Sequence, residues 1–127
     1  MGFFDGLMGN ATEVDSNKMQ EEISDILVPG ENVHSAYKVI RDTFVFTDKR
    51  LILIDKQGLT GKKVEYNSIP YKSIASFSVE TAGTFDMDSE LKIWISGHSI
   101  PLQKTFNQAA NIVKVQQTLA EFVLKAR

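Results

Sequence analysis

Between residues 33 and 103, hydrophobic and polar positions alternate along short stretches that are separated by turns. A period of two is typical of strands that bury one face. β-Branched and aromatic residues fill the stretches, and Gly, Asp and Lys are frequent in the connections, as in antiparallel hairpins. Seven such short strands favour an antiparallel sandwich or a partly open barrel. They are predicted at 33–40, 43–47, 50–55, 63–69, 74–81, 89–96 and 99–103.

The segment before these strands has helical spacing. Five apolar residues recur there at intervals of three to five positions: Val14, Met19, Ile23, Ile26 and Leu27. This spacing predicts a short helix over about 14–28. Thr12 and Asp15 have the spacing of a capping box, and Pro29 with Gly30 would end the helix. Because its apolar stripe is one-sided, we expect it to pack on its own domain or on a neighbouring subunit.

A longer helix is predicted at the C-terminus, over about 105–126, where Thr105 and Gln108 match the capping box. It has two apolar stripes. The first contains Phe106, Ala109, Ala110, Val113, Ala120 and Val123, and the second contains Ile112, Val115, Leu119, Phe122 and Ala126. A helix that caps a sandwich needs about one stripe, so the second is expected to face water or a partner. The alternative is one wide core face that accommodates both stripes.

The strand at 89–96 contains the only tryptophan. Leu91, Ile93 and Ile95 share one face of this strand, which leaves Trp94 on the polar face with Lys92. Aromatic side chains in such positions often anchor interfaces. The candidate interface for a closed homo-oligomer therefore consists of Trp94, Ile112, Val115, Leu119 and Phe122.

Length and composition are those of one globular domain. We assign residues 1–11 to a flexible leader and residues 12–127 to a single domain. Of the 127 residues, 43% are hydrophobic and 24% charged, which excludes a disordered or fibrous chain. No apolar run approaches the roughly 18 residues of a membrane span. The absence of cysteine excludes thiolate chemistry and disulfides, and a cytoplasmic location is expected.

Charge is unevenly distributed along the chain. Residues 1–31 carry seven acids and one base, for a net charge of −6, whereas the remainder carries thirteen bases and nine acids, for +4. Either an acidic arm lies on a basic body, or the N-terminal helix has a solvated acidic face.

Candidate catalytic groups are few. His34 and His98 are the only histidines, and the chain has no Gly-x-Ser-x-Gly motif. Asp86, Asp88 and Glu90 are spaced two apart, but without the pattern of a calcium loop. We therefore expect no enzymatic activity, no metal and no cofactor. A pI near 5.6 also argues against nucleic-acid binding.

Four segments together resemble the bacterial pleckstrin-homology (PH) domain family: residues 46–63, 68–74, 77–83 and 91–97. The resemblance implies a mainly β, seven-stranded sandwich capped by a C-terminal helix. It also implies ring-shaped homo-oligomers built by edge and helix contacts, with no established ligand and no catalytic activity. The eukaryotic lipid-binding cluster lies in the first hairpin. That hairpin has only Lys38 and Arg41 here, with Asp42 beside them, so phosphoinositide binding is not expected.

Two functional hypotheses follow. The first is a non-catalytic scaffold that assembles with itself and binds an unknown protein partner. The second is a peripheral membrane module with an apolar anchor in the leader and a basic patch. The anchor would be Phe3, Phe4, Leu7 and Met8, and the patch Lys49, Lys56, Lys62 and Lys63. The seven N-terminal acids disfavour the membrane hypothesis, because an anionic bilayer repels them.

Overall fold

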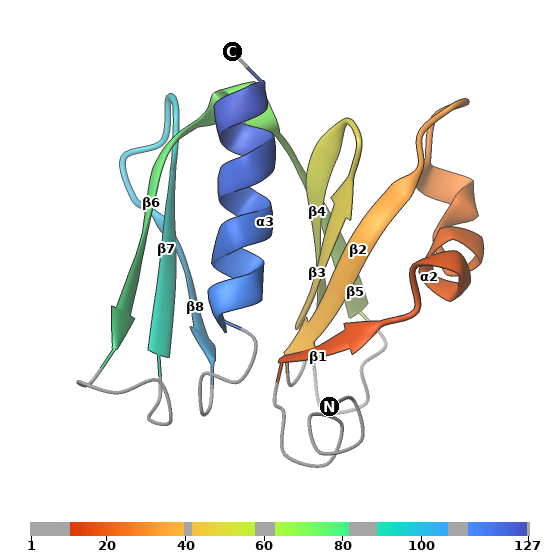
Figure 1. Ribbon diagram of the computed structural model, residues 1–127, viewed down its shortest axis with the longest axis horizontal. Helices are drawn as coiled ribbons and strands as arrows, with labels where there is room; N and C mark the ends of the chain where they lie inside the picture. The colour runs from red at the N-terminus through yellow and green to blue at the C-terminus, as the bar shows by residue number, and fades with distance from the viewer. Residues whose placement is uncertain (1–10, 40–41, 58–62, 82–88, 107–111, 127) are drawn as a thin grey trace. The chain divides into compact units, whose positions relative to one another are not determined.

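The computed structural model describes residues 11–39, 42–57, 63–81, 89–106 and 112–126. Within these ranges the strands form two antiparallel sheets, which confirms the mainly β class (Figure 1). The chain divides into two compact units, one of residues 13–70 and one of residues 71–127 with 1–12. In chain order the elements are β1 (Ala11–Val14), α2 (Ser16–Glu22), the 3₁₀ turn η1 (Ser24–Ile26), β2 (Val33–Val39), β3 (Asp42–Thr47), β4 (Arg50–Gln57), β5 (Lys63–Pro70), the 3₁₀ turn η2 (Tyr71–Ser73), β6 (Ile74–Thr81), β7 (Ser89–Ile95), β8 (Leu102–Phe106) and α3 (Ile112–Lys125).

The first sheet has the strand order β1-β2-β3-β4-β5. In its centre, Phe44 pairs with Leu53 and Val45 pairs with Ile52. All four residues are buried, although neighbours along a strand point to opposite faces. Both faces of β3 and β4 are therefore covered, which explains why these two strands are continuously apolar. Strand β1 was not predicted, and Ala11 belongs to it rather than to a leader; residues 1–10 lie outside the described ranges.

The N-terminal helix is shorter than predicted. It covers Ser16–Glu22, and its cap is Asp15, whose carboxylate accepts a 2.8 Å hydrogen bond from the backbone N of Asn17. The capping role predicted for Thr12 is wrong, because Thr12 lies in β1. After Ile23 the backbone leaves the α-helical path and continues as η1.

The apolar stripe of this segment packs on its own unit, as predicted. Met19 and Ile23 are buried in one cluster with four residues of the first sheet: Ala36, Val45, Ile52 and Ile54. Val14, Ile26 and Leu27 are partly buried against the same cluster. The segment therefore covers one face of the first sheet.

The second sheet has the order β6-β7-β8. Leu91 and Ile93 are buried, whereas Lys92 and Trp94 on the opposite face are half-buried, which agrees with the predicted phase. Ile95, predicted on the buried face, is only half-buried at the end of the strand. The last strand was predicted at 99–103 but begins at Leu102 and ends at Phe106. Pro101 precedes it, since proline cannot donate a hydrogen bond to a sheet.

The C-terminal helix begins at Ile112, seven residues later than predicted, because Thr105 belongs to β8 and does not cap a helix. The stripe expected to face water is buried within the chain: Ile112, Val115, Leu119 and Phe122. The ring of Phe122 stacks on Tyr71 of η2, with 4.8 Å between ring centroids. The expectation of an exposed stripe is therefore wrong. The exposed apolar residues of α3 are Val113 (39% exposed) and Leu124 (64% exposed).

Candidate functional site

A buried carboxylate lies in the first unit. The side chain of Glu31 is fully buried, and its Oε2 accepts hydrogen bonds from Nε of Arg50 at 2.9 Å and from Oγ1 of Thr47 at 2.6 Å. Its Oε1 accepts from Nη2 of Arg50 at 3.0 Å and from the backbone N of Val28 at 3.1 Å. Two parallel bonds from one guanidinium form the fork geometry in which arginine binds carboxylates most strongly. The carboxylate therefore accepts four hydrogen bonds from three residues.

These contacts determine the charge state of Glu31. Burial by itself would raise its pKa, because it disfavours the charged form. The hydrogen bonds from Arg50, Thr47 and Val28, together with the positive charge of Arg50, outweigh burial and lower the pKa from 4.5 to about 2. Glu31 is therefore a stable carboxylate at neutral pH. A general acid or base would need a pKa near the working pH, so this site does not suit proton transfer.

A tight turn places Glu31. The backbone N of Glu31 donates a 3.0 Å hydrogen bond to the carbonyl of Val28, which closes a four-residue turn. Pro29 and Gly30 occupy its central positions, and Gly30 has φ +83°. A type II turn requires a positive φ at its third residue, which glycine adopts without strain.

The turn between β3 and β4 supplies the partners. Oγ1 of Thr47 accepts hydrogen bonds from the backbone N of Lys49 at 3.1 Å and of Arg50 at 3.0 Å. The next residue, Asp48, exchanges two 3.0 Å hydrogen bonds with the backbone of Asn32. The segment Thr47–Arg50, part of the sequence that carries the family resemblance, thus fixes residues 31 and 32 onto the sheet.

Arg50 also reaches beyond Glu31. Its Nη2 donates to the carbonyl of Ile26 at 2.6 Å, and its Nη1 donates to Oγ of Ser68 at 2.9 Å. Arg50 thereby connects η1, the turn before β2, and β5. We refer to Glu31, Thr47 and Arg50 below as the Glu31 latch.

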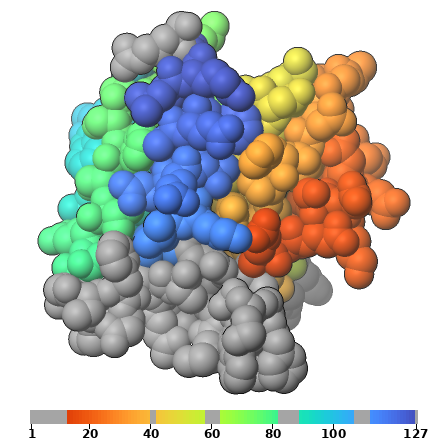
Figure 2. Space-filling view, viewed as in Figure 1, coloured from red at the N-terminus to blue at the C-terminus, as the bar shows by residue number. Residues whose placement is uncertain are grey.

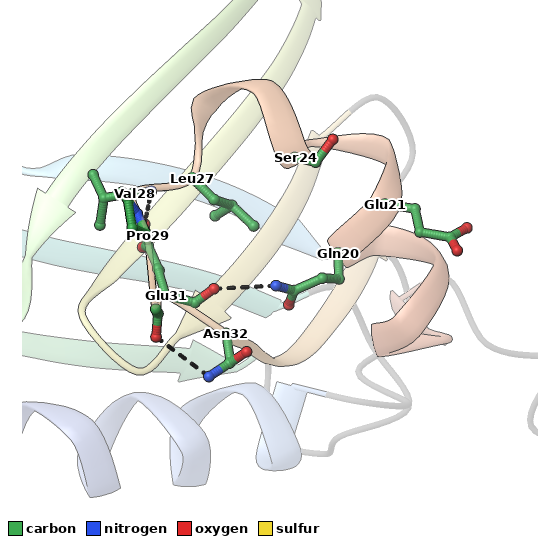
Figure 3. Close-up of a pocket in the computed structure, with 9 residues that line it drawn as sticks. Gln20, Glu21, Ser24, Leu27, Val28, Pro29, Glu31 and Asn32 are labelled. Carbon is green, nitrogen blue, oxygen red and sulfur yellow. Dashed lines mark hydrogen bonds between the residues drawn. The ribbon is translucent and has the colours of Figure 1, made fainter.

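A groove of about 530 Å³ lies beside the latch (Figure 3). The carboxamide of Gln20 spans it, donating to the carbonyl of Glu31 at 3.1 Å and accepting from the backbone N of Val33 at 2.6 Å. Figure 3 shows the side chain of Glu21 directed away from these groups. The polar groups that span the groove are thus engaged with backbone, and they stabilise the fold. The lining residues are Gln20, Glu21, Ser24, Leu27, Val28, Pro29, Gly30, Glu31 and Asn32.

The predicted basic patch is not brought together. Lys49 precedes β4, whereas Lys56 lies near the end of that strand, about 23 Å away at the usual rise per residue. Lys63 lies beside the end of β4, paired with Gln57. Lys62 lies outside the described residues. Lys49, Lys56 and Lys63 are all exposed, but Lys49 does not belong to the same patch.

The two candidate catalytic histidines belong to different units of the chain. His34 is exposed on β2 in the first unit, with Nδ1 3.0 Å from Oγ of Ser35. His98 is exposed in the turn after β7 in the second unit. In the described part of the chain, no three His, Asp or Glu residues are arranged to hold a metal. Asp86 and Asp88 lie outside that part, as does Arg41 of the expected hairpin site.

Sequence reasoning missed the latch. Glu31 was counted only as one of the N-terminal acids, and Arg50 only as the first residue of a strand. A Pro-Gly turn before an acid gives no signal of which base will pair with it nineteen positions later. The exposed acids Glu21, Glu22 and Asp25 agree with a solvated acidic face.

Comparison with known proteins establishes the class. The family described as Bacterial PH domain matches residues 2–123, and the chain belongs to this family. Two solved structures share the fold. One is a pleckstrin-homology domain of Shewanella amazonensis SB2B, with 60% identity, a TM-score of 0.83 and coverage of 95% of this chain and 98% of the other. The other is a protein with such a domain from Shewanella loihica PV-4, with 56% identity, a TM-score of 0.78 and coverage of 91% and 98%.

A sequence relative has been named but not assigned a function. The uncharacterized protein YjqA of Bacillus subtilis (strain 168) is 60% identical over 121 residues, which cover 94% of this chain and 97% of YjqA. The matched family is one of PH domains and does not indicate a catalytic class. No helix in the described ranges is long and apolar enough to cross a membrane.

Proposed function

We propose that this protein is a non-catalytic, cytoplasmic interaction module that assembles with itself into a closed oligomer and binds another protein. The observation that carries this proposal is that each sheet ends in a long edge strand. Strands β5 and β6, of eight residues each, end the first and the second sheet. An edge strand presents unpaired backbone N–H and C=O groups that can bind a further strand.

Strand β5 is the edge that we assign to self-assembly. Tyr66, near its middle, is 48% exposed, and Ser68, on the same face, is exposed as well. Tyrosine is enriched at protein interfaces, because its ring buries apolar area and its hydroxyl remains hydrogen-bonded. If cyclic symmetry relates the subunits that meet at this edge, the ring of subunits closes and the oligomer has a fixed size.

The membrane hypothesis has less support. Its basic patch is divided between the two ends of β4, and Glu21, Glu22 and Asp25 are exposed on the N-terminal segment. An anionic bilayer attracts clustered lysines and repels such acids. We expect no co-sedimentation with liposomes that contain anionic lipid at about 150 mM salt, where the Debye length is about 8 Å.

Light scattering coupled to gel filtration tests the proposal. The wild type should have a mass several times the 14.2 kDa of one chain. Tyr66→Lys should lower this mass and leave the circular dichroism spectrum unchanged, because it adds a charge to the proposed contact. Leu124→Lys, at an exposed position on α3, is the matched control and should keep the wild-type mass. A wild type of 14.2 kDa would refute self-assembly.

A further inference from the structure

The edge strand of the second sheet has features that suit a bound peptide. Among the described strands, β6 pairs only with β7, so none of them pairs with its other edge. Figure 2 shows β6, in green, along the surface beside α3. Natural edges are usually protected by lysine, proline or a short length. Strand β6 has eight residues, of which only Glu80 is charged, and it contains no proline.

The outer face of β6 carries two small side chains. Ser76 and Ser78 are exposed on this face, and the residues opposite them on β7 are Trp94 and Lys92. Because serine is short, a large side chain from an added strand could extend over Ser76 toward the half-buried ring of Trp94. Aromatic rings attract each other beyond the area they bury when their centroids come within about 4.5–7 Å.

The third position on this face carries an unbalanced charge. Glu80 lies directly opposite Glu90, and like charges at opposed positions destabilise a sheet. Glu90 accepts a 2.5 Å hydrogen bond from the side chain of Gln103, whereas Glu80 is exposed on the edge strand. Lys92 lies two residues further along β7, opposite Ser78. No basic residue is therefore directly opposite Glu80 or Glu90 on the paired strands. A basic residue on an added strand would complement Glu80.

We propose that the β6 edge binds an extended segment of another protein by strand addition. The segment has a basic residue opposite Glu80, a small residue opposite Ser78 and an aromatic or large apolar residue opposite Ser76. In antiparallel order this gives the pattern basic-x-small-x-aromatic, since alternate side chains of a strand share one face. This inference rests on the proposed interaction function and names the edge and the kind of partner.

The probe is the capped peptide Thr-Arg-Val-Thr-Val-Phe-Thr, titrated into the full chain. Trp94 is the only tryptophan, so its fluorescence reports binding at this face. We expect a saturable change. Glu80→Lys should weaken binding of this peptide about fivefold, which is close to the largest effect of one cross-strand charge pair. The variant should instead favour a peptide with Glu in place of Arg. Glu121→Lys, the same charge change on an exposed position of α3, should have no effect.

Two results would overturn the inference: the absence of a saturable signal, and a Glu80→Lys variant that binds both peptides as the wild type does. If the signal is absent and Glu80→Lys also lowers the mass of the assembly, β6 is the contact for a second copy of the chain. Ser76→Arg, which fills the space before Trp94, should also abolish binding.

The two proposals can fail separately. An oligomeric wild type that does not bind the peptide would refute only this inference, whereas a monomeric wild type would refute self-assembly.

Discussion

Arg50 holds the carboxylate of Glu31 with two hydrogen bonds, from Nε at 2.9 Å and from Nη2 at 3.0 Å. The pair connects the turn before β2 to the start of β4, and the same guanidinium binds the carbonyl of Ile26. The N-terminal segment is therefore fixed to the first sheet by charge as well as by apolar packing.

Removing the guanidinium of Arg50 should destabilise the fold. Arg50→Met would leave the buried carboxylate without its counter-charge, and we expect a loss of about 3 kcal/mol in the free energy of unfolding. Urea denaturation measures this loss. The matched control is Lys49→Met at the neighbouring exposed position, which should change stability by less than about 0.5 kcal/mol. The double variant Glu31→Gln with Arg50→Met should recover part of the loss, because the unpaired charge is gone. Equal losses in Arg50→Met and Lys49→Met would show that the pair contributes nothing.

The latch also predicts how stability depends on pH. The pKa of Glu31 is about 2 in the folded protein and 4.5 in a free glutamate. A lowered folded-state pKa stabilises the fold fully above the unfolded value, and this contribution is lost as pH falls from about 4.5 to about 2. The difference in unfolding free energy between wild type and Glu31→Gln should therefore shrink by about 3 kcal/mol over this range. A difference that stays constant between pH 6 and pH 2.5 would contradict the assigned pKa.

Packing of the N-terminal segment can be tested by truncating one side chain. Ile23 is buried in the cluster on the first sheet, so Ile23→Ala should cost about 2–4 kcal/mol in thermal or urea unfolding. Val28→Ala, at a position that is 49% exposed just beyond the same segment, should cost much less. If both variants unfold like the wild type, the segment does not contribute to the core.

The C-terminal helix offers a sharp comparison between two leucines. Leu119 is fully buried and Leu124 is 64% exposed. Leu119→Glu should unfold the domain or destabilise it by several kcal/mol, because it places a charge in the core. Leu124→Glu should remain folded with a near-native melting temperature. A folded Leu119→Glu that merely dissociates an oligomer would restore the interface role first predicted for this stripe.

Period-two patterning predicted most of the strands, because burial on one face leaves a signal along the sequence. It failed where that signal is absent. Strand β1 is four residues long, too short to show a period. The boundary between the last strand and the C-terminal helix was predicted too early. Thr105 and Gln108 have the spacing of a capping box, but the chain remains a β-strand through Phe106.

Helix α3 shows a second limit of sequence reasoning. Its two apolar stripes are visible in the sequence, but which of them faces the core depends on the elements that surround the helix. Phe122 stacks on Tyr71, about fifty positions earlier in the chain, and no local pattern indicates this contact. The same holds for Glu31 and Arg50, whose pairing depends on two turns that only the folded sheet brings together.

Native mass spectrometry of the wild-type chain tests the central claim most directly, since it resolves how many copies of the 14.2 kDa chain associate. A closed assembly has one stoichiometry, because every contact surface is used. We predict a single dominant species with a fixed number of subunits across at least a tenfold range of concentration, and we predict that Tyr66→Lys abolishes it. A spectrum of monomers alone, or an open ladder of every size, would contradict the account.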